Sequence, residues 1–410
     1  MIPNIIQRIK TTVLVCLFSM LTLGCISKSI VNLQTGNPFA EHTWSNKADK
    51  IEVPFTWYDG HIIIETSING QAGLKLALDS GASATVLFET LRSKSMSLNV
   101  DTTLDLPGST VNLINDAKVS VSGITIENLT IVHVPLEQSP LFNSFEEAYF
   151  DGAIGYDVLK QYVTKIDYQN QKVIFYKKHD LEKLSSDWLV LPIMIKGNIP
   201  YIEASLKNND DQKESQFFVL DTGAPDYIYI NSQLVENVSF PEKHFLGNMK
   251  HFEGASQIKT GRLPYFEFAN TEFSDVTSHD VGHFSDDYGV GLLGSGLLRK
   301  YDVIFDYQSE KIAFRKAKKT TLTTPIDRSG LNMEPHIHGG VVIDVASRSG
   351  ASKLSLLPGD IITHINRTAV TEHNFDQLRA LFSSELVKLP ICWQRAGSKQ
   401  CGELVLSSRL

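Results

Sequence analysis

Short apolar runs separated by turn residues recur along the chain, a pattern typical of β-strands rather than helices. In residues 218–230, FVLDTGAPDYIYI, an apolar run stands before a single acid, Asp221, and Ile228 and Ile230 follow it. Because an ionised carboxylate taken out of water without a partner costs several kcal/mol, Asp221 requires either a turn or a function. Turn chemistry alone would explain one such motif, since Asp, Thr, Gly and Pro are all common turn residues.

The same pattern occurs a second time, earlier in the chain. Residues 74–88, LKLALDSGASATVLF, place Asp79 where the later segment has Asp221, 142 residues further on. Residues 152–176 also align without a gap with residues 291–315, at an offset of 139. A repeat of this extent predicts two homologous lobes built mainly from β-strands.

The repeated motifs resemble those of the aspartic peptidases. Each repeat carries two apolar residues, then Asp, Ser or Thr, Gly and Ala, and later two apolar residues and Gly at 153–155 and 292–294. In the family, these later glycine segments pass beside the catalytic loops. The resemblance covers about residues 51–318 and implies one β lobe over 51–182 and a second over 183–318.

The resemblance implies that Asp79 and Asp221 form the catalytic pair of an endopeptidase. Two carboxyls held face to face cannot both ionise, so they share one proton and supply both the base that activates water and the acid that protonates the carbonyl oxygen. The hydroxyls beside them would bond to backbone of the opposite lobe, with turn chemistry as the alternative, and the glycines would let backbone approach the carboxylates. The residues implied to support the pair are Ser80, Gly81, Thr222 and Gly223.

Two alanines bear on the acidity of this pair. Ala82 and Ala224 stand where pepsin-like enzymes have a hydroxyl that bonds to the carboxylate, and this matches the retroviral type. With fewer hydrogen bonds to the charged form, the pair should be less acidic, so we expect activity at milder pH than pepsin's. In the family a hairpin closes over the substrate, and the candidates are residues 104–114 and 250–261, with no catalytic flap residue assigned.

The composition argues against several other classes of protein. The chain has 410 residues, of which 42% are hydrophobic and 20% charged, enough for two or three globular domains. Its net charge of −8, with no Lys/Arg block longer than RKAKK, argues against nucleic-acid binding. Two histidine pairs, His279 with His283 and His336 with His338, have chelating spacings but no third ligand, so we predict no metal and no cofactor.

The first residues are typical of a targeting segment. Two cationic residues precede the apolar stretch 13–23, which is too short to span a bilayer. The LTLGC at its end resembles the lipobox of bacterial lipoproteins, which implies a signal peptide over 1–24 and a lipid anchor on Cys25. Ile26 then implies the outer membrane of the cell envelope, facing the periplasm. Residues 25–50 would form a polar tether; the alternative, an ordinary secretory signal, also takes the protein out of the cytoplasm.

The last part of the chain has a different pattern. Residues 339–370 resemble a PDZ domain of the bacterial envelope-protease type, with a strand, a small-residue turn, Leu-Pro-Gly-Asp and a second strand, before an amphipathic helix over 375–384. The resemblance implies a PDZ domain over 322–410 that adds C-terminal peptides as a strand to a sheet edge. The implied carboxylate-binding residues are Gly330, Leu331, Asn332 and Met333, whose alternative is a linker turn.

Two cysteines, Cys392 and Cys401, remain outside the targeting segment and the proposed lipid site. If Ala396 and Gly397 form a two-residue hairpin turn, these cysteines lie directly opposite each other. An oxidising envelope would then allow a disulfide, with two free thiols as the alternative.

Taken together, these patterns predict a lipid-anchored aspartic endopeptidase that cleaves peptides or proteins in the cell envelope, with a PDZ domain that assists capture. The alternative is an envelope scaffold that binds peptides without cutting them. Retention of both Asp79 and Asp221 with both following glycines favours the enzyme. The physiological substrate and the cleavage-site preference stay open.

Overall fold

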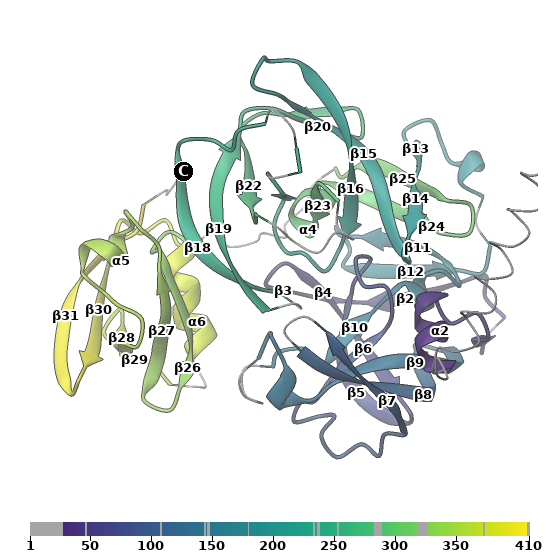
Figure 1. Cartoon of the computed structure of the whole chain (residues 1–410), viewed down its shortest axis with the longest axis horizontal. Helices are drawn as coiled ribbons and strands as arrows, with labels where there is room; N and C mark the ends of the chain where they lie inside the picture. The colour runs from purple at the N-terminus through teal and green to yellow at the C-terminus, as the bar shows by residue number, and fades with distance from the viewer. Residues whose placement is uncertain are drawn as a thin grey trace, which may run out of the picture.

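The computed structural model describes residues 28–45, 47–106, 109–142, 145, 148–178, 180–232, 234–235, 238–251, 254–282, 289–318, 327–371 and 374–407. The described part of the chain is mainly β (Figure 1). Its strands form four sheets, accompanied by a few short helices. Two sheets form the two predicted lobes, a third is shared between them, and the fourth forms a C-terminal domain. None of the helices in the described ranges has the length and apolar composition that a membrane crossing requires.

The first lobe is a nine-stranded sheet with a central order β9-β6-β10-β5-β4. In it β10 runs parallel to β5 and antiparallel to β6, and β6 runs parallel to β9. Its strands are β1 (Glu41–Trp44), β3 (Thr56–Tyr58), β4 (His61–Ile68), β5 (Gln71–Leu78), β6 (Val86–Phe88), β7 (Val100–Leu106), β8 (Ser109–Val121), β9 (Ile124–Val134) and β10 (Gly152–Ile154). Its short helices are α2 (Lys28–Gln34), η1 (Leu136–Gln138) and α3 (Tyr156–Leu159).

The second lobe repeats this arrangement. Its central order is β22-β17-β23-β16-β15, with β23 parallel to β16 and antiparallel to β17, and β17 parallel to β22. Its elements are β14 (Met194–Lys196), β15 (Ile199–Lys207), β16 (Lys213–Asp221), β17 (Ile228–Ile230), β18 (His244–His251), β19 (Gly254–Leu263), β20 (Phe266–Phe268), β21 (Thr271–Phe273), β22 (Val276–Asp280), β23 (Gly291–Gly294) and α4 (Ser295–Leu298). The matching strand orders confirm the prediction of two homologous β lobes.

A six-stranded sheet joins the two lobes. Its order is β13-β25-β24-β11-β12-β2, so β11 of the first lobe pairs directly with β24 of the second. Its strands are β2 (Lys50–Pro54), β11 (Val163–Asp167), β12 (Lys172–Tyr176), β13 (Leu189–Pro192), β24 (Tyr301–Asp306) and β25 (Lys311–Lys316), and the predicted boundary between 182 and 183 lies in η2 (Leu181–Lys183). One hydrophobic core runs through both lobes and this sheet, which makes them a single packing unit.

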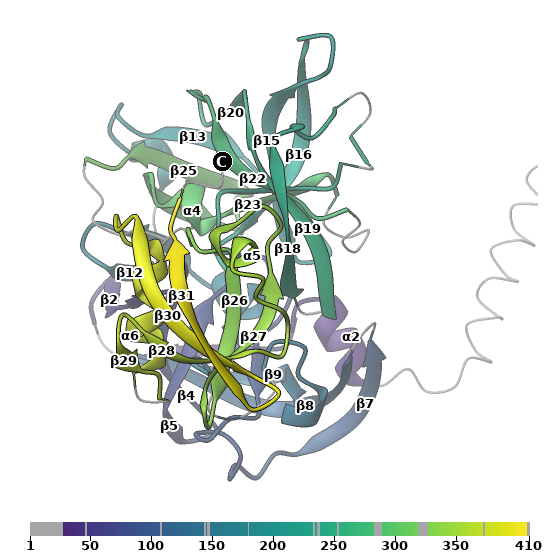
Figure 2. The ribbon, with the colours of Figure 1, turned by 90° about the vertical axis from the view of Figure 1, so that its left-hand side faces the viewer.

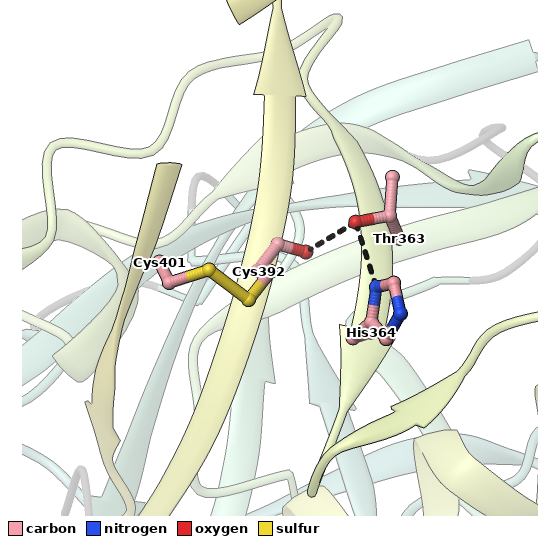
Figure 3. Close-up of a disulfide and its surroundings, with 4 residues drawn as sticks. All are labelled: Thr363, His364, Cys392 and Cys401. Atoms are coloured by element: carbon pink, nitrogen blue, oxygen red, sulfur yellow. Dashed lines mark hydrogen bonds between the residues drawn. A yellow bond between two sulfur atoms is a disulfide. The ribbon is translucent and has the colours of Figure 1, made fainter. Parts of the chain in front are cut away.

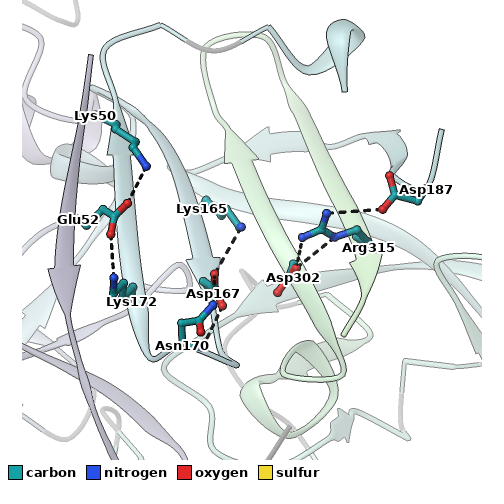
Figure 4. Close-up of polar contacts among 9 residues, drawn as sticks. All are labelled: Lys50, Glu52, Lys165, Asp167, Asn170, Lys172, Asp187, Asp302 and Arg315. Atoms are coloured by element: carbon teal, nitrogen blue, oxygen red, sulfur yellow. Dashed lines mark hydrogen bonds and ion pairs between the residues drawn. The ribbon is translucent and has the colours of Figure 1, made fainter. Parts of the chain in front are cut away.

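Ion pairs cross neighbouring strands of the shared sheet, as Figure 4 shows. Glu52 on β2 contacts Lys50 on its own strand and Lys172 on β12, at 2.6 and 2.9 Å. Hydrogen bonds from these two lysines lower the pKa of Glu52 to about 2. Toward the other end of the strand order, Arg315 on β25 contacts Asp302 on the neighbouring strand β24 at 2.6 Å. Because the Glu52 pairs are exposed, they support strand register more than overall stability.

The C-terminal domain has its own sheet and its own core (Figure 2). The strand order is β26-β27-β28-β30-β31, so β26 lies at an edge. The elements are β26 (Leu331–His336), β27 (Gly339–Val345), α5 (Gly350–Lys353), β28 (Ile361–Ile365), β29 (Thr368–Ala369), α6 (Phe375–Arg379), η4 (Ala380–Ser383), β30 (Lys388–Arg395) and β31 (Ser398–Val405). The strands and the helix predicted between 339 and 384 are present. Of the four helix residues expected in the core, Phe375, Leu378 and Phe382 are buried and Leu381 is half-buried.

The predicted tether over 25–50 is wrong for residues 28–44. This segment forms α2 and β1, and β1 adds to the edge of the first lobe by pairing with β9. Asn37 is buried. Its side-chain Nδ2 donates to the Thr130 carbonyl at 3.0 Å and to Oδ2 of Asp157 at 3.2 Å, and its Oδ1 accepts from the Thr130 N–H at 2.8 Å. The segment looked like a tether because the side chains it buries are polar, and their burial is compensated by hydrogen bonds. The signal peptide and Cys25 lie outside the described residues.

Candidate active site

Asp79 and Asp221 lie face to face between the lobes. Asp79 directly follows β5, and Asp221 ends β16, the equivalent strand of the second lobe. Each of these strands runs beside the predicted glycine segment of its lobe, and the Asp79 N–H donates to the carbonyl of Ile154 at 3.0 Å. The two carboxyl groups are within hydrogen-bonding reach of each other. The pseudo-twofold arrangement of the lobes therefore brings the two predicted catalytic residues to one point.

The two predicted glycines allow the carboxyls to approach the opposite loop. A Cβ added to Gly81 would lie 2.6 Å from the carboxyl carbon of Asp221, and one added to Gly223 would lie 2.4 Å from that of Asp79. Carbon atoms do not approach this closely, so no larger residue fits without moving the carboxyls. The glycines are required by this close approach and not by a positive φ.

Ser80 and Thr222 link the two loops through four hydrogen bonds. The Ser80 N–H donates to Thr222 Oγ1 and the Thr222 N–H to Ser80 Oγ, both at 2.9 Å. Each hydroxyl donates across to the other lobe, from Ser80 to the Leu220 carbonyl at 2.7 Å and from Thr222 to the Leu78 carbonyl at 2.6 Å. The expected bonding to backbone of the opposite lobe is thus present, and the site is a rigid pair of interlocked loops.

Backbone N–H groups hold one oxygen of each carboxyl. Oδ1 of Asp79 accepts from Gly81 and Ala82 at 2.8 and 3.0 Å. Oδ1 of Asp221 accepts from the corresponding pair in its own loop, at 2.8 and 3.1 Å. Since alanine follows the glycine in both loops, no side-chain hydroxyl adds a third bond there.

The pKa values of both carboxyls are raised, so the two groups do not readily ionise at the same time. Burial raises the pKa of Asp79, against the hydrogen bonds from Asp221 and the loop N–H groups. Burial, followed by the negative charge of Asp79, raises the pKa of Asp221 well above its ordinary value. Such a pair retains one proton where isolated carboxyls are ionised. One carboxyl can then accept a proton from water while the other donates one to a carbonyl oxygen.

His61, at the start of β4, is a site residue that the sequence pattern did not reveal. Its ring stacks on Phe150 at 5.8 Å, and its Nδ1 lies 3.3 Å from the hydroxyl of Tyr149. Burial lowers the pKa of His61, although the nearby charges of Asp59 and Asp79 oppose the shift. Since the charge of Asp79 acts on this imidazole, His61 lies near the carboxyl pair on the side of the first lobe.

Asp226 and His279 form a second polar group next to the pair. Asp226 lies five residues after Asp221 in the same loop, and its Oδ2 is 2.9 Å from Nε2 of His279. Burial would raise the pKa of Asp226, but His279 and then Arg299 outweigh burial and lower it. The only sequence signal was that Asp226 has no counterpart in the first repeat, where Ala84 stands instead.

Three of the four histidines with chelating spacings, His279, His336 and His338, lie within the described residues. The described residues hold no group of three or more His, Cys, Asp and Glu side chains that could bind a metal ion. His279 instead bonds to Asp226 and Thr260, and the rings of His336 and His338 lie 5.5 Å apart at the β26–β27 turn. His283 lies outside the described residues.

Two hairpins occupy the positions predicted for a flap. In the first lobe β7 pairs with β8, and in the second lobe β18 pairs with β19 over its whole length. The tips of both hairpins, at 107–108 and 252–253, lie outside the described residues. On β18, Lys250 forms an ion pair with Glu334 of β26, so this hairpin contacts the C-terminal domain.

The predicted carboxylate-binding loop of the C-terminal domain already uses two of its N–H groups. The Gly330 N–H donates to Oδ1 of Asp327 at 2.6 Å, and the Leu331 N–H donates to Oγ of Ser329 at 2.9 Å. A peptide carboxylate at these positions would have to displace both side chains. Asn332 is exposed and Met333 is buried on β26, the edge strand of the sheet. The edge of β26 therefore fits the prediction of strand addition better than the loop fits carboxylate capture.

Cys392 and Cys401 form the predicted disulfide, shown in Figure 3. They face each other across β30 and β31, and the turn between these strands has positive φ at Ala396 and Gly397, as a two-residue hairpin requires. The carbonyl of Cys392 accepts a hydrogen bond from Thr363 of β28 at 3.3 Å. The prediction of a disulfide here is confirmed.

Solved structures similar to this chain are known. No family model matches the chain, and a search of curated proteins returns no match. Among solved structures, the chain is similar to the aspartic proteinase from Irpex lacteus, with 13% sequence identity and a TM-score of 0.44. The similarity covers 67% of this chain and 99% of that protein's chain.

Proposed function

We propose that this protein is an aspartic endopeptidase whose catalytic groups are Asp79 and Asp221. The observation that carries the proposal is the pair of carboxyls that two lobes of the same topology bring together. The pKa of each carboxyl is raised, so the two do not readily ionise at the same time. One carboxyl would remove a proton from water as the water attacks the peptide carbonyl. The other would protonate the carbonyl oxygen. No metal or cofactor takes part in this proposal.

The direct test is incubation of the purified protein with a proteome-derived peptide library across a range of pH, with new peptide ends read by mass spectrometry. We expect internal cuts at milder pH than pepsin's, because the two loops lack hydroxyl bonds to the carboxylates. Binding of peptides with no new ends at any pH would instead support the non-catalytic scaffold.

We further propose that the C-terminal domain is a PDZ-type domain that presents substrates to the lobes. Two features support it: β26 is an edge strand, and Lys250 joins that strand to the β18–β19 hairpin. An extended peptide added to β26 would lie close to the second lobe. A variant ending near Thr320 should cut short peptides as well as the full chain does, but lose efficiency on long substrates. Equal rates on long substrates would contradict this role.

Lipid anchoring at Cys25 and an outer-membrane location facing the periplasm also remain proposals. They rest on the LTLGC motif of the sequence. Mass spectrometry of the protein isolated from membranes should find an acylated N-terminal Cys25. A mature chain that begins elsewhere and fractionates without membranes would contradict the anchor.

A further inference from the structure

Asp226 presents a carboxylate beside the catalytic pair that is only partly used by the protein. Its Oδ2 bonds to His279 at 2.9 Å, and its Oδ1 has no partner among the residues that the structure describes. The side chain of Asp226 is 34% exposed. The carboxylate can therefore be reached from the solvent.

The carboxylate is held in a fixed orientation by His279. The His279 side chain is only 9% exposed, its Nδ1 lies 2.9 Å from Oγ1 of Thr260, and its ring is tilted against that of Tyr229 at 4.9 Å. The hydroxyl of Tyr229 in turn accepts from the Asp226 N–H at 3.3 Å. Strands β17, β19 and β22 therefore all contribute to this arrangement. A carboxylate oriented in this way can bind a cation without first being ordered.

Asp226 lies in the loop that also carries Asp221, five residues after it. A Cβ added to Gly60 would lie 2.3 Å from Cβ of Pro225, so the β3–β4 turn packs on the loop that carries Asp221 and Asp226. In that turn, Asp59 adds a second carboxylate near this end of the site. Its Oδ2 already lies 3.7 Å from the guanidinium of Arg379 in the C-terminal domain.

The first lobe has no equivalent carboxylate. At the position of Asp226 it has Ala84, and at that of Tyr229 it has Leu87. A histidine, His133, occupies the register position of His279, since it pairs with Leu87 as His279 pairs with Tyr229. The second lobe alone therefore has a carboxylate at this position. We expect it to recognise a substrate residue on one side of the scissile bond only.

We propose that Asp226 anchors a subsite for a cationic substrate side chain, Lys or Arg, close to the scissile bond, with His279 as its positioning residue. This rests on the proposed peptidase function. An Arg or Lys head group would bond to the free Oδ1 of Asp226 and replace its water. A carboxylate with one oxygen held by a buried imidazole discriminates strongly between a cation and a neutral side chain of the same shape.

The test compares peptides that differ only by Arg against citrulline, or Lys against norleucine, at the positions flanking the cut. For the wild-type protein, we expect kcat/KM to be at least about tenfold higher for the cationic peptide at one position. Asp226→Asn should reduce that ratio about tenfold or more, and His279→Leu should reduce it in part. The matched control is Asp275→Asn, an exposed acid of the second lobe, which should keep the wild-type ratio.

Binding provides a second measurement that does not depend on turnover. In the Asp221→Asn background, the arginine peptide should bind at least about tenfold more weakly after Asp226→Asn, and the citrulline peptide should not change in the same way. If the wild-type protein cuts nothing, the peptidase proposal fails while the binding comparison still decides the subsite. Equal arginine-to-citrulline ratios with and without Asp226, in both measurements, would overturn the subsite.

Discussion

Ser80 and Thr222 bond to each other reciprocally across the boundary between the lobes, each N–H donating to the other's hydroxyl oxygen at 2.9 Å. Both residues are almost fully buried. The carboxyls that precede them are held at the ends of two strands from separate sheets. Their mutual position therefore depends on these bonds as well as on packing of the lobes.

Replacing Ser80 by Ala should destabilise the protein measurably. The change leaves the Thr222 N–H and the Leu220 carbonyl without their partner in a buried place, at a cost of about 1–3 kcal/mol. Denaturant unfolding would measure this difference. Thr110→Ala is the control, because its hydroxyl bonds to Asp105 in an exposed hairpin. A stability loss no larger than in the control would contradict the role given to Ser80.

The raised pKa of Asp221 predicts how stability depends on pH. The folded protein retains a proton on this carboxyl above the unfolded pKa of about 3.9, so the wild-type free energy of unfolding falls as pH rises from there through the raised folded pKa. Asp221→Asn removes this ionisation. The variant should therefore gain stability relative to the wild type as pH rises through that interval. A difference that does not change with pH would show that folding does not raise the pKa of Asp221.

Reduction of the disulfide should destabilise the C-terminal domain. Cys392 and Cys401 are separated by 9 residues, and closing a loop of that length contributes about 2–3 kcal/mol in the chain-entropy account. The double change Cys392→Ser and Cys401→Ser should lower the free energy of unfolding by this amount, with Trp393 as a buried reporter in the same domain. Dithiothreitol should destabilise the wild type and leave the double variant unaffected. Two free thiols in the purified protein would contradict the disulfide.

The N-terminal segment should contribute to stability through Asn37. Asn37→Gly keeps a residue that accepts the positive φ of 57° but removes the bonds to Thr130 and Asp157, so we expect a loss of about 1–3 kcal/mol. Asn270→Gly is the matched control, since Asn270 has a φ of 54° in an exposed turn. Unfolding and protease cleavage near residue 45 would both report the change. If residues 28–44 were a tether, the two variants would behave alike.

The sequence predicted the lobes and the carboxyl pair because both are repeated. Asp79 and Asp221 occur in matching strand patterns, and a repeat specifies which residues the pseudo-twofold axis brings together. Asn37 was missed because the pattern treats polar residues as exposed, whereas Asn37 is buried with its hydrogen bonds satisfied. The pairing of Asp226 with His279 joins residues 53 apart that have no repeated partner, so only the folded chain reveals it.

The central claim is that Asp79 and Asp221 act as one catalytic unit. The most direct test measures cleavage of the best library peptide by the wild type, by Asp79→Asn and by Asp221→Asn, with circular dichroism to verify that each variant is folded. Because either change removes the carboxyl pair that shares a proton, we predict that both variants lose cleavage while retaining the fold. Turnover by a folded Asp221→Asn protein comparable to that of the wild type would contradict the claim.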